Sequence, residues 1–166
     1  MPDRKTMERA AEDKREGKAP TTQAGEFVRE EMHHIREGKH GAQSTKQAIA
    51  IGLSKARRAG VKLPPPKEGT VPEKTRKSAK RALAAGAHGP KPASPRRSRA
   101  ITAALKREGH TAASKSSLAR QAKSAARKRT AGARSAAARK AAKTKDSSLR
   151  SAAARKAART RARSTG

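Results

Sequence analysis

The fold is decided by two neighbouring stretches, AGEFVREEMHHIREG (24–38) and STKQAIAIGLSKARRAG (44–60). Each repeats apolar residues at the three- and four-residue spacing of an amphipathic helix. These residues are Phe27, Val28, Met32 and Ile35 in the first stretch and Ile49, Leu53 and Ala56 in the second. Because a short polar loop separates the stretches, the sequence predicts a helical hairpin over residues 21–60, with the two apolar stripes packed together.

The ends of these helices carry their own signals. Gly38 and Gly60 follow the last periodic residues and are natural helix stops. Ser44 and Gln47 form an S-x-x-Q capping box, which satisfies free amides at a helix start. A unit below about 40 residues rarely folds alone. We therefore expect the hairpin either to pack on a partner or to form a homo-oligomer.

Charge divides the chain into two regions. Residues 74–166 carry 28 Lys and Arg against two acids, Glu108 and Asp146, a net charge of +26. Residues 1–60 carry 13 basic and nine acidic side chains. A long block of one sign repels itself unless a polyanion neutralises it. In a cell the obvious polyanion is nucleic acid.

Composition limits how much of the chain can fold alone. The 166 residues include one Phe, three Met and no Trp or Tyr, and much of the apolar content is Ala. So little apolar surface cannot offset the conformational entropy of the whole chain. We expect a mainly α protein where ordered, with a long, largely disordered tail rich in Ala, Lys and Arg that contains helix-forming segments.

Several functional classes are disfavoured. The chain has no cysteine, which removes disulfides, thiol nucleophiles and zinc fingers. It shows no apolar run near 18 residues and no secretory signal at its start, so we expect a cytoplasmic protein. No Ser-His-acid set, Walker loop, GxGxxG motif or paired carboxylates occur in a plausible setting. The sequence predicts a protein that is not an enzyme and uses no cofactor.

The sequence predicts four segments. They are a charged flexible N-terminus (1–20), the helical hairpin (21–60), a Pro-rich linker (61–72) and a basic low-complexity tail (73–166). Glycine and proline divide the tail into helix-forming stretches at 73–85, 95–108 and 111–131.

The tail ends in a repeat. RSAAARKAAKTK (134–145) and RSAAARKAARTR (150–161) agree at ten of twelve positions with a period of 16, and both differences exchange Lys for Arg. No apolar residue larger than Ala occurs inside either unit, so the repeats cannot pack a core as solenoid repeats do. They keep helix propensity and positive charge instead.

The repeats suggest how the tail binds. Arg139, Lys140 and Lys143 stand at i, i+1 and i+4, so on a helix they project towards one side, as a row of phosphates requires. We expect folding on binding, affinity from counterion release, and little base specificity. The candidate nucleic-acid-binding residues are Lys77, Lys80, Arg81, Arg96, Arg97, Arg99, Lys123, Arg127, Lys128, Arg129, Arg134, Arg139, Lys140, Lys143, Arg150, Arg155, Lys156, Arg159 and Arg161.

The tetrapeptide Ser94-Pro95-Arg96-Arg97 has two interpretations. A proline-fixed turn could present two arginines to a narrow A·T-rich minor groove. Equally, Ser94 and Pro95 are residues favoured at a helix start. Single-strand binders stack bases on aromatic side chains, and this chain has only Phe27, so duplex DNA is favoured over sequence-specific RNA recognition.

Three histidines, His33, His34 and His40, lie close to Glu30 and Glu37. Two imidazoles and a carboxylate can bind Zn²⁺ or Ni²⁺. Adjacent histidines, however, point about 100° apart on a helix, and no strong metal-site spacing is met. The sequence therefore predicts surface or phosphate-contacting histidines and no metal site.

Two resemblances follow from these motifs. With its two repeats and its SPRR tetrapeptide, the tail resembles the C-terminal tails of linker histones and the bacterial histone-H1-like proteins. Residues 27–60 resemble a small uncharacterised bacterial domain with a V-x-x-x-M-H helix and a K-Q-A-I-A-I-x-L-S helix. The matching residues are Val28, Met32, His33, Gly38, Lys46, Gln47, Ala48, Ile49, Ala50, Ile51, Leu53 and Ser54. The resemblance implies a bacterial source, and hence the nucleoid.

The interpretation that follows is non-sequence-specific binding and compaction of duplex DNA by a nucleoid-associated protein. Three alternatives stay open: an RNA- or ribosome-associated protein, a cationic membrane-active protein, and a regulator whose hairpin binds a protein partner. Membrane insertion is disfavoured because the Ala-rich helices lack a bulky apolar face.

Overall fold

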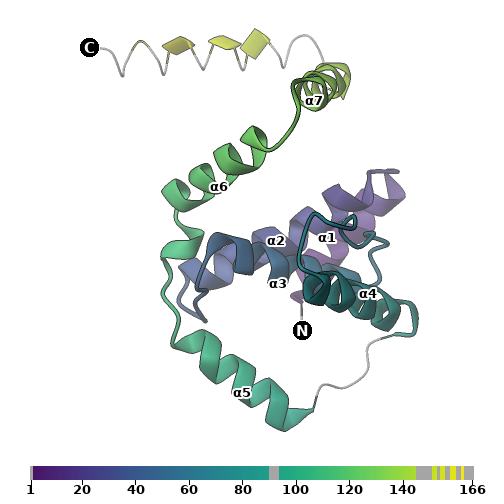
Figure 1. Ribbon diagram of the computed structural model, residues 1–166, viewed down its shortest axis with the longest axis vertical. Coiled ribbons are helices and arrows are strands. Elements are labelled where there is room, and N and C mark those ends of the chain that lie inside the picture. Colours follow the sequence, from purple (N-terminus) through teal and green to yellow (C-terminus); the bar gives the residue numbers. More distant parts are fainter. Residues whose placement is uncertain are drawn as a thin grey trace. The chain divides into compact units, whose positions relative to one another are not determined.

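The computed structural model describes residues 2–89 and 94–144, together with 151, 152, 154, 155, 158, 159 and 162. Across these residues all regular structure is helical, which confirms the mainly α prediction. The elements are α1 (Arg4–Arg15), α2 (Pro20–Arg36), α3 (Thr45–Arg58), α4 (Glu73–Ala87), α5 (Pro95–Lys106), the 3₁₀ turn η1 (Thr111–Ala113), α6 (Lys115–Arg127) and α7 (Ala131–Thr144) (Figure 1). The chain divides into two compact units, Met1–Gln121 and Ala122–Gly166, with α6 spanning the division.

The two predicted helices at the centre are present as α2 and α3. Gly38 and Gly60 follow them with φ of 74° and 91°, a conformation that glycine adopts without strain. At the start of α3 the Ser44 hydroxyl accepts a hydrogen bond from the Gln47 amide at 3.2 Å. The Gln47 side chain accepts from the amide of Gln43 rather than that of Ser44, so the expected capping box is shifted by one residue on that side.

The helices α2 and α3 approach each other closely at a glycine. A Cβ atom added at Gly52 would lie 2.7 Å from the Cα atom of Val28, closer than real Cβ contacts allow. Only glycine lets the two backbones pack at this distance. The sequence pattern placed Gly52 inside a helix but gave no sign of this contact.

The apolar residues form two clusters within the first unit. The first contains Ala10, Ala24, Phe27, Ala56, Val61 and Leu63, with Leu53 and Ala59 against it. The second contains Met32, Ile35, Ala42, Ala48, Ala112 and Ala113, with Val28, Ile49 and Leu118 against it. Both clusters therefore draw on residues outside 21–60, which explains how so small a hairpin gains a core.

The N-terminal segment, expected to be flexible, forms α1 and packs on α2. Ala10 is buried with Phe27, and Lys18 pairs with Asp13 at 2.8 Å in the turn that follows α1. Further along α2, the carboxylate of Glu30 accepts a hydrogen bond from the Asp3 amide. The apolar face of α1 is narrow, and for this reason the pattern alone did not predict its packing.

The predicted linker begins inside the core. Val61 and Leu63 are buried, and the guanidinium of Arg57 donates to the carbonyls of Leu63 and Pro64, both at 3.1 Å. Burial away from water lowers the pKa of Arg57. These bonds fix the chain as it leaves α3 and turns back towards the start of α4.

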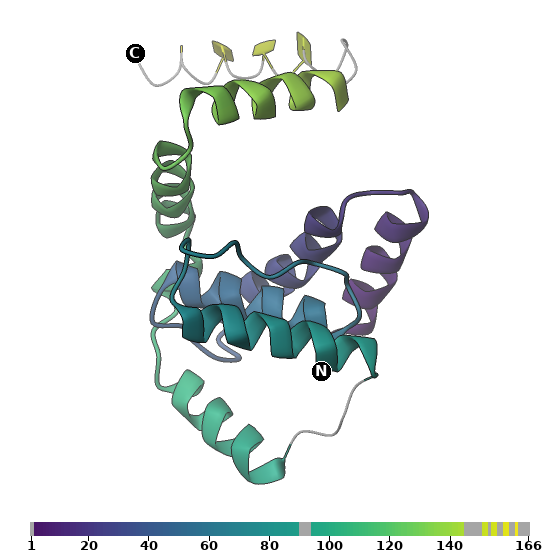
Figure 2. The same cartoon turned by 45° about the vertical axis from the view of Figure 1, so that its right-hand side comes forward.

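After this return, α4 lies beside α3 and runs in the same direction (Figure 2). Ala79 and Ala82 are the buried residues of α4. Gly86, expected to end the helix, lies inside it, and a Cβ atom there would fall 1.9 Å from the Arg57 carbonyl oxygen. Gly86 therefore allows the ends of α3 and α4 to approach each other closely, and it does not end its own helix.

Candidate nucleic-acid interface

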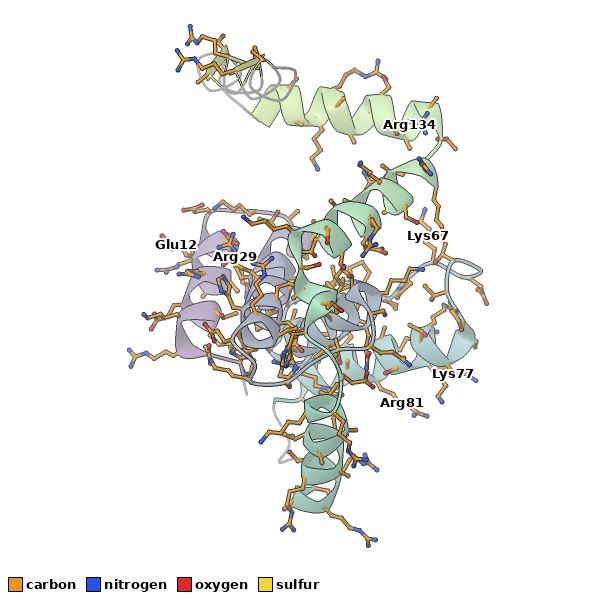
Figure 3. All side chains as sticks on the ribbon, turned by 90° about the vertical axis from the view of Figure 1, so that its left-hand side faces the viewer. Glu12, Arg29, Lys67, Lys77, Arg81 and Arg134 are labelled. Carbon is orange, nitrogen blue, oxygen red and sulfur yellow. The ribbon has the colours of Figure 1, made fainter. Side chains whose placement is uncertain are left out.

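The first group of candidate residues lies on the solvent side of α4. Lys77, Lys80 and Arg81 are exposed, while Ala79 and Ala82 on the same helix are buried. Figure 3 shows the side chains of Lys77 and Arg81 extending outward from α4. A helix that packs through alanine alone thus leaves its long cationic side chains in solvent.

The second group lies at the start of α5. Arg96, Arg97 and Arg99 are exposed, and α5 buries no side chain. Pro95 occupies the first turn of this helix, and the Ser94 side chain makes no capping hydrogen bond. The tetrapeptide is therefore a helix start, one of the two interpretations that the sequence left open.

The third group follows α6 into the second unit. Lys123, Arg127, Lys128 and Arg129 are all exposed. The carbonyl of Arg129 accepts a hydrogen bond from the Arg134 guanidinium at 2.7 Å, at the junction with α7. The Thr130 hydroxyl accepts from the amide of Ala133 and so caps α7.

The fourth group belongs to α7, which contains the first repeat. The exposed cations Arg134, Arg139 and Lys140 are on this helix, and the Lys143 side chain lies outside the described residues. With about 100° per residue, positions 139, 140 and 143 fall within roughly 100° of arc, whereas Arg134 points away from them. Positions 139, 140 and 143 of the repeat therefore share one side of the helix, and Arg134 does not.

The second repeat is described only in part. Arg155 and Arg159 are helical and exposed. Arg150, Lys156 and Arg161 lie outside the described residues.

The basic region, residues 74–144, contains far fewer acidic residues than the first three helices. Residues 74–144 contain one acid, Glu108. In α1–α3 and their loops, by contrast, cations and acids are paired: Arg29 with Glu26 at 3.0 Å, and Lys39 with Glu37 at 3.0 Å. The hydrogen bond to Lys39 lowers the pKa of Glu37 and raises that of Lys39. The N-terminal charges are thus largely balanced within the fold.

Beyond α4, which packs on α3, the basic region is attached to the hairpin at residues 105–113. The amide of Gly41 donates to the Leu105 carbonyl at 2.8 Å, and that of Ala42 donates to the Gly109 carbonyl at 3.0 Å. Ala112 and Ala113 are buried in the second cluster. Two side chains complete the attachment: Arg36 donates to the Ala113 carbonyl at 2.9 Å, and Thr45 donates to the Ala112 carbonyl at 2.7 Å.

This attachment could not be predicted from the sequence. Ala112 and Ala113 lie in a stretch of small and basic residues that composition assigns to the tail. The expected helix from Thr111 begins later, at Lys115, because Thr111–Ala113 form η1 against the hairpin and the Ser114 hydroxyl accepts the capping bond from Ser117. Backbone-to-backbone docking of small residues leaves no periodic signal to detect.

A second polar cluster lies within the first unit, around Glu31. Glu31 is fully buried, and its Oε2 atom lies 2.6 Å from Lys55 Nζ. Its Oε1 atom lies 3.4 Å from His40 Nε2. Glu31, His34 and His40 each offer one ligand atom, and these atoms lie within 4.8 Å of one another. His33, also weighed from the sequence, is exposed and is not part of this set.

The sequence contained a signal for Glu31 that was missed. Phe27, Glu31 and Ile35 are spaced four apart, so Glu31 lies on the apolar stripe of its helix. A charged residue in such a stripe must find a partner when buried. Lys55 is that partner, and it lies three residues after Gly52 on the facing side of α3.

Comparison with known proteins gives one match. Residues 20–67 are similar to a family of unknown function, DUF6496. This match supports the predicted resemblance to a small uncharacterised domain, and it covers α2, α3 and the buried start of the linker. No curated protein and no solved structure matches the chain, so the likeness of the tail to linker histones gains no support from these comparisons. Across the described residues, no helix combines the length and apolar character needed to cross a membrane.

Proposed function

We propose that this protein binds duplex DNA without base-sequence preference, through phosphate contacts made by the basic helices α4–α7 and the repeats. Helix α4 is packed on α3 and presents its cations to solvent, and residues 105–113 attach the chain that follows α4 to the hairpin. Binding many phosphates at once along a tail would also compact the DNA. Nucleoid association follows from this activity as part of the same proposal.

The observation that carries the proposal is the exposure of cations with almost no acid beside them. The candidate lysines and arginines that the structure describes are exposed on α4, α5, α6 and α7, and residues 73–144 contain two acids, Glu73 and Glu108. Such a surface releases counterions when phosphates replace them, which is the main source of affinity in non-specific DNA binding.

The start of α5 adds a further argument for phosphate contacts. Arg96 and Arg97 stand in the first turn of a helix that has no acid there. The positive end of the helix dipole disfavours cations at this position, and a bound phosphate relieves that repulsion. A helix start of this kind favours backbone contacts over an inserted minor-groove turn, so we expect little A·T preference.

The lack of an exposed Phe, Trp or Tyr side chain favours a duplex over single-stranded nucleic acid. Phe27 is the only aromatic residue of the Phe, Trp and Tyr types, and it is 1% exposed in the first apolar cluster. It cannot stack on a base without unfolding the core. Binding by charge alone recognises the phosphate rows of a duplex, and duplex RNA is the alternative that shares this chemistry.

The experiment is a salt series with the full-length protein and a duplex DNA of mixed sequence. We expect the logarithm of the affinity to fall steeply and linearly with the logarithm of salt concentration. Equal affinities for A·T-rich and G·C-rich duplexes are expected, since phosphates carry no base identity. Weak or salt-insensitive association would contradict the proposal. Tighter binding to duplex RNA of the same length would favour the RNA-associated alternative.

A further inference from the structure

The cluster around Glu31 brings together three groups from two elements. Glu31 and His34 are three residues apart on α2 and so share a side of the helix. His40 comes from the loop between α2 and α3, which turns back at Gly38, where φ is 74°. The His34 and His40 rings lie 6.2 Å apart between centroids and nearly perpendicular, at 84°.

The tautomer of His40 follows from its neighbours. Its Nδ1 atom lies 3.1 Å from the Gly41 carbonyl oxygen, which can only accept a hydrogen bond, so the proton is on Nδ1. In a neutral imidazole the lone pair is then on Nε2. That atom faces Glu31 Oε1 at 3.4 Å.

The facing carboxylate oxygen is also without a donor. Glu31 is 0% exposed, and neither of its carboxylate oxygens has a hydrogen-bond partner among the residues that the structure describes, although Oε2 lies 2.6 Å from Lys55 Nζ in an ion pair. Two lone pairs that face each other in a buried site repel, and a buried carboxylate oxygen without a partner is costly. A cation between the two atoms would remove both problems.

The spacing of the two atoms fits such a cation. Zinc binds imidazole nitrogen and carboxylate oxygen at about 2.1 Å, usually in tetrahedral geometry. Two ligand atoms at tetrahedral angles and about 2.1 Å from one ion lie about 3.4 Å apart. This value equals the separation of 3.4 Å between His40 Nε2 and Glu31 Oε1.

The surrounding charges agree with a divalent ion. Glu30 and Glu31 are both buried, and Lys55 is the ammonium group beside them, at 3.7 Å and 2.6 Å. One ammonium balances one of the two carboxylates. Lys55 holds Oε2 of Glu31, which leaves Oε1 for the ion, and Asp3 Oδ2 lies 3.3 Å from His34 Nε2. Carboxylates beside metal-binding imidazoles commonly orient them.

We propose that Glu31, His34 and His40 bind one Zn²⁺ ion, contrary to the expectation from histidine spacing. The ion fixes the loop between α2 and α3, whose residues Gly41 and Ala42 hold the backbone of 105–109. Zinc thereby stabilises the attachment of the basic region to the hairpin. The site is independent of the DNA-binding proposal, since none of its residues is among the lysines and arginines proposed to contact DNA.

The test starts from full-length protein stripped of metal with a chelator. We expect zinc titration by calorimetry to show one ion per chain, and the melting temperature to rise as zinc is added. Cobalt, as a spectroscopic substitute, should give the intense visible absorption of a tetrahedral site. Absence of stoichiometric binding to the unmodified protein would overturn the proposal, and a melting temperature indifferent to zinc would overturn the role of the ion in holding the loop.

Substitutions locate the ion. His40→Gln and Glu31→Gln should each abolish stoichiometric zinc binding, whereas Asp3→Asn should weaken it by about 10- to 100-fold. His33→Gln is the matched control, because His33 is on the same helix beside His34 but exposed, and it should bind zinc like the unmodified protein. Equal loss in His33→Gln and His40→Gln would place the ion elsewhere and overturn the assignment. The cobalt spectrum of the unmodified chain decides the geometry even if a variant fails to fold.

Discussion

Helices α3 and α7 have the same length and the same number of cations but very different surroundings. Both have 14 residues and four lysines and arginines, whereas α3 has three alanines and α7 has seven. Helix α3 adds Ile49, Ile51 and Leu53 and packs between α2 and α4, whereas every side chain of α7 that the structure describes is exposed. Burial of Ala48, Gly52 and Ala56, with Ile49 and Leu53 partly buried beside them, therefore distinguishes a core helix from a solvent-exposed cationic one.

The cations of the two helices differ in the same way. In α3, Lys55 pairs with Glu31, and Arg57 donates to two backbone carbonyls. In α7, Arg139 and Lys140 are exposed in a stretch without acids. Two of the four cations of α3 thus serve the fold, whereas the described cations of α7 are exposed.

The largest effect on the packed region should come from Phe27→Ala. Removing this fully buried ring leaves a cavity between α1, α2 and α3 and should cost about 3–5 kcal/mol. We expect the cooperative thermal transition followed by circular dichroism to be lost or strongly lowered. Met7→Ala, at a position 40% exposed, should change stability by less than about 0.5 kcal/mol. A Phe27→Ala variant that melts like the unmodified protein would show that the packing of α1–α3 is wrong.

A smaller effect should follow from filling the contact between α2 and α3. Gly52→Ala puts a methyl group 2.7 Å from the Val28 Cα atom and should destabilise the protein by about 1–3 kcal/mol. Gly25→Ala is the matched control, because Gly25 lies inside α2 with nothing within 4 Å of the added atom. It should stabilise by about 0.5–1 kcal/mol through helix propensity. Chemical denaturation measures the free energy of unfolding of both variants. If both substitutions destabilised the protein, or both stabilised it, the close contact of α2 and α3 at Gly52 would be contradicted.

The smallest effect separates two helix caps of similar geometry. Ser44 caps α3 and Thr130 caps α7, each accepting from an amide at 3.2 Å. Ser44→Ala should lower the stability of the first unit by about 1 kcal/mol. Thr130→Ala should leave the melting temperature unchanged, because α7 has no buried side chain among those described. A drop of equal size in Thr130→Ala would mean that α7 belongs to the packed region.

Much of the fold could be predicted because it rests on local signals. The periodic stripes, the serine cap and the two glycines after α2 and α3 are each readable from a few neighbouring residues. The contacts that complete the core depend on atoms far apart in sequence. Gly52, Gly86 and the alanines of η1 work by allowing backbones to approach, and glycine or alanine carries no side-chain pattern to announce this.

The two candidate sites also differ in how far they could be predicted from the sequence. The basic residues could be found from charge density, and the structure adds that those described are exposed. The cluster around Glu31 was only half visible, since histidine spacing along one helix hid the convergence of His40 from the loop. The signal available in the sequence was Glu31, an acid on the apolar stripe of its helix, because a buried charge needs a partner.

The central claim is that tail cations bind phosphate while cations of the hairpin do not. The most direct test measures the salt dependence of duplex DNA affinity for two full-length variants that each lose two charges. Arg139→Gln with Lys140→Gln alters α7, and Lys46→Gln with Arg58→Gln alters exposed positions of α3. The α7 variant should flatten the slope of log affinity against log salt by up to about 1.8, at about 0.9 per phosphate contact, and the α3 variant should leave it unchanged. Equal flattening in both variants would contradict the account, because it would show that the whole chain binds by net charge alone.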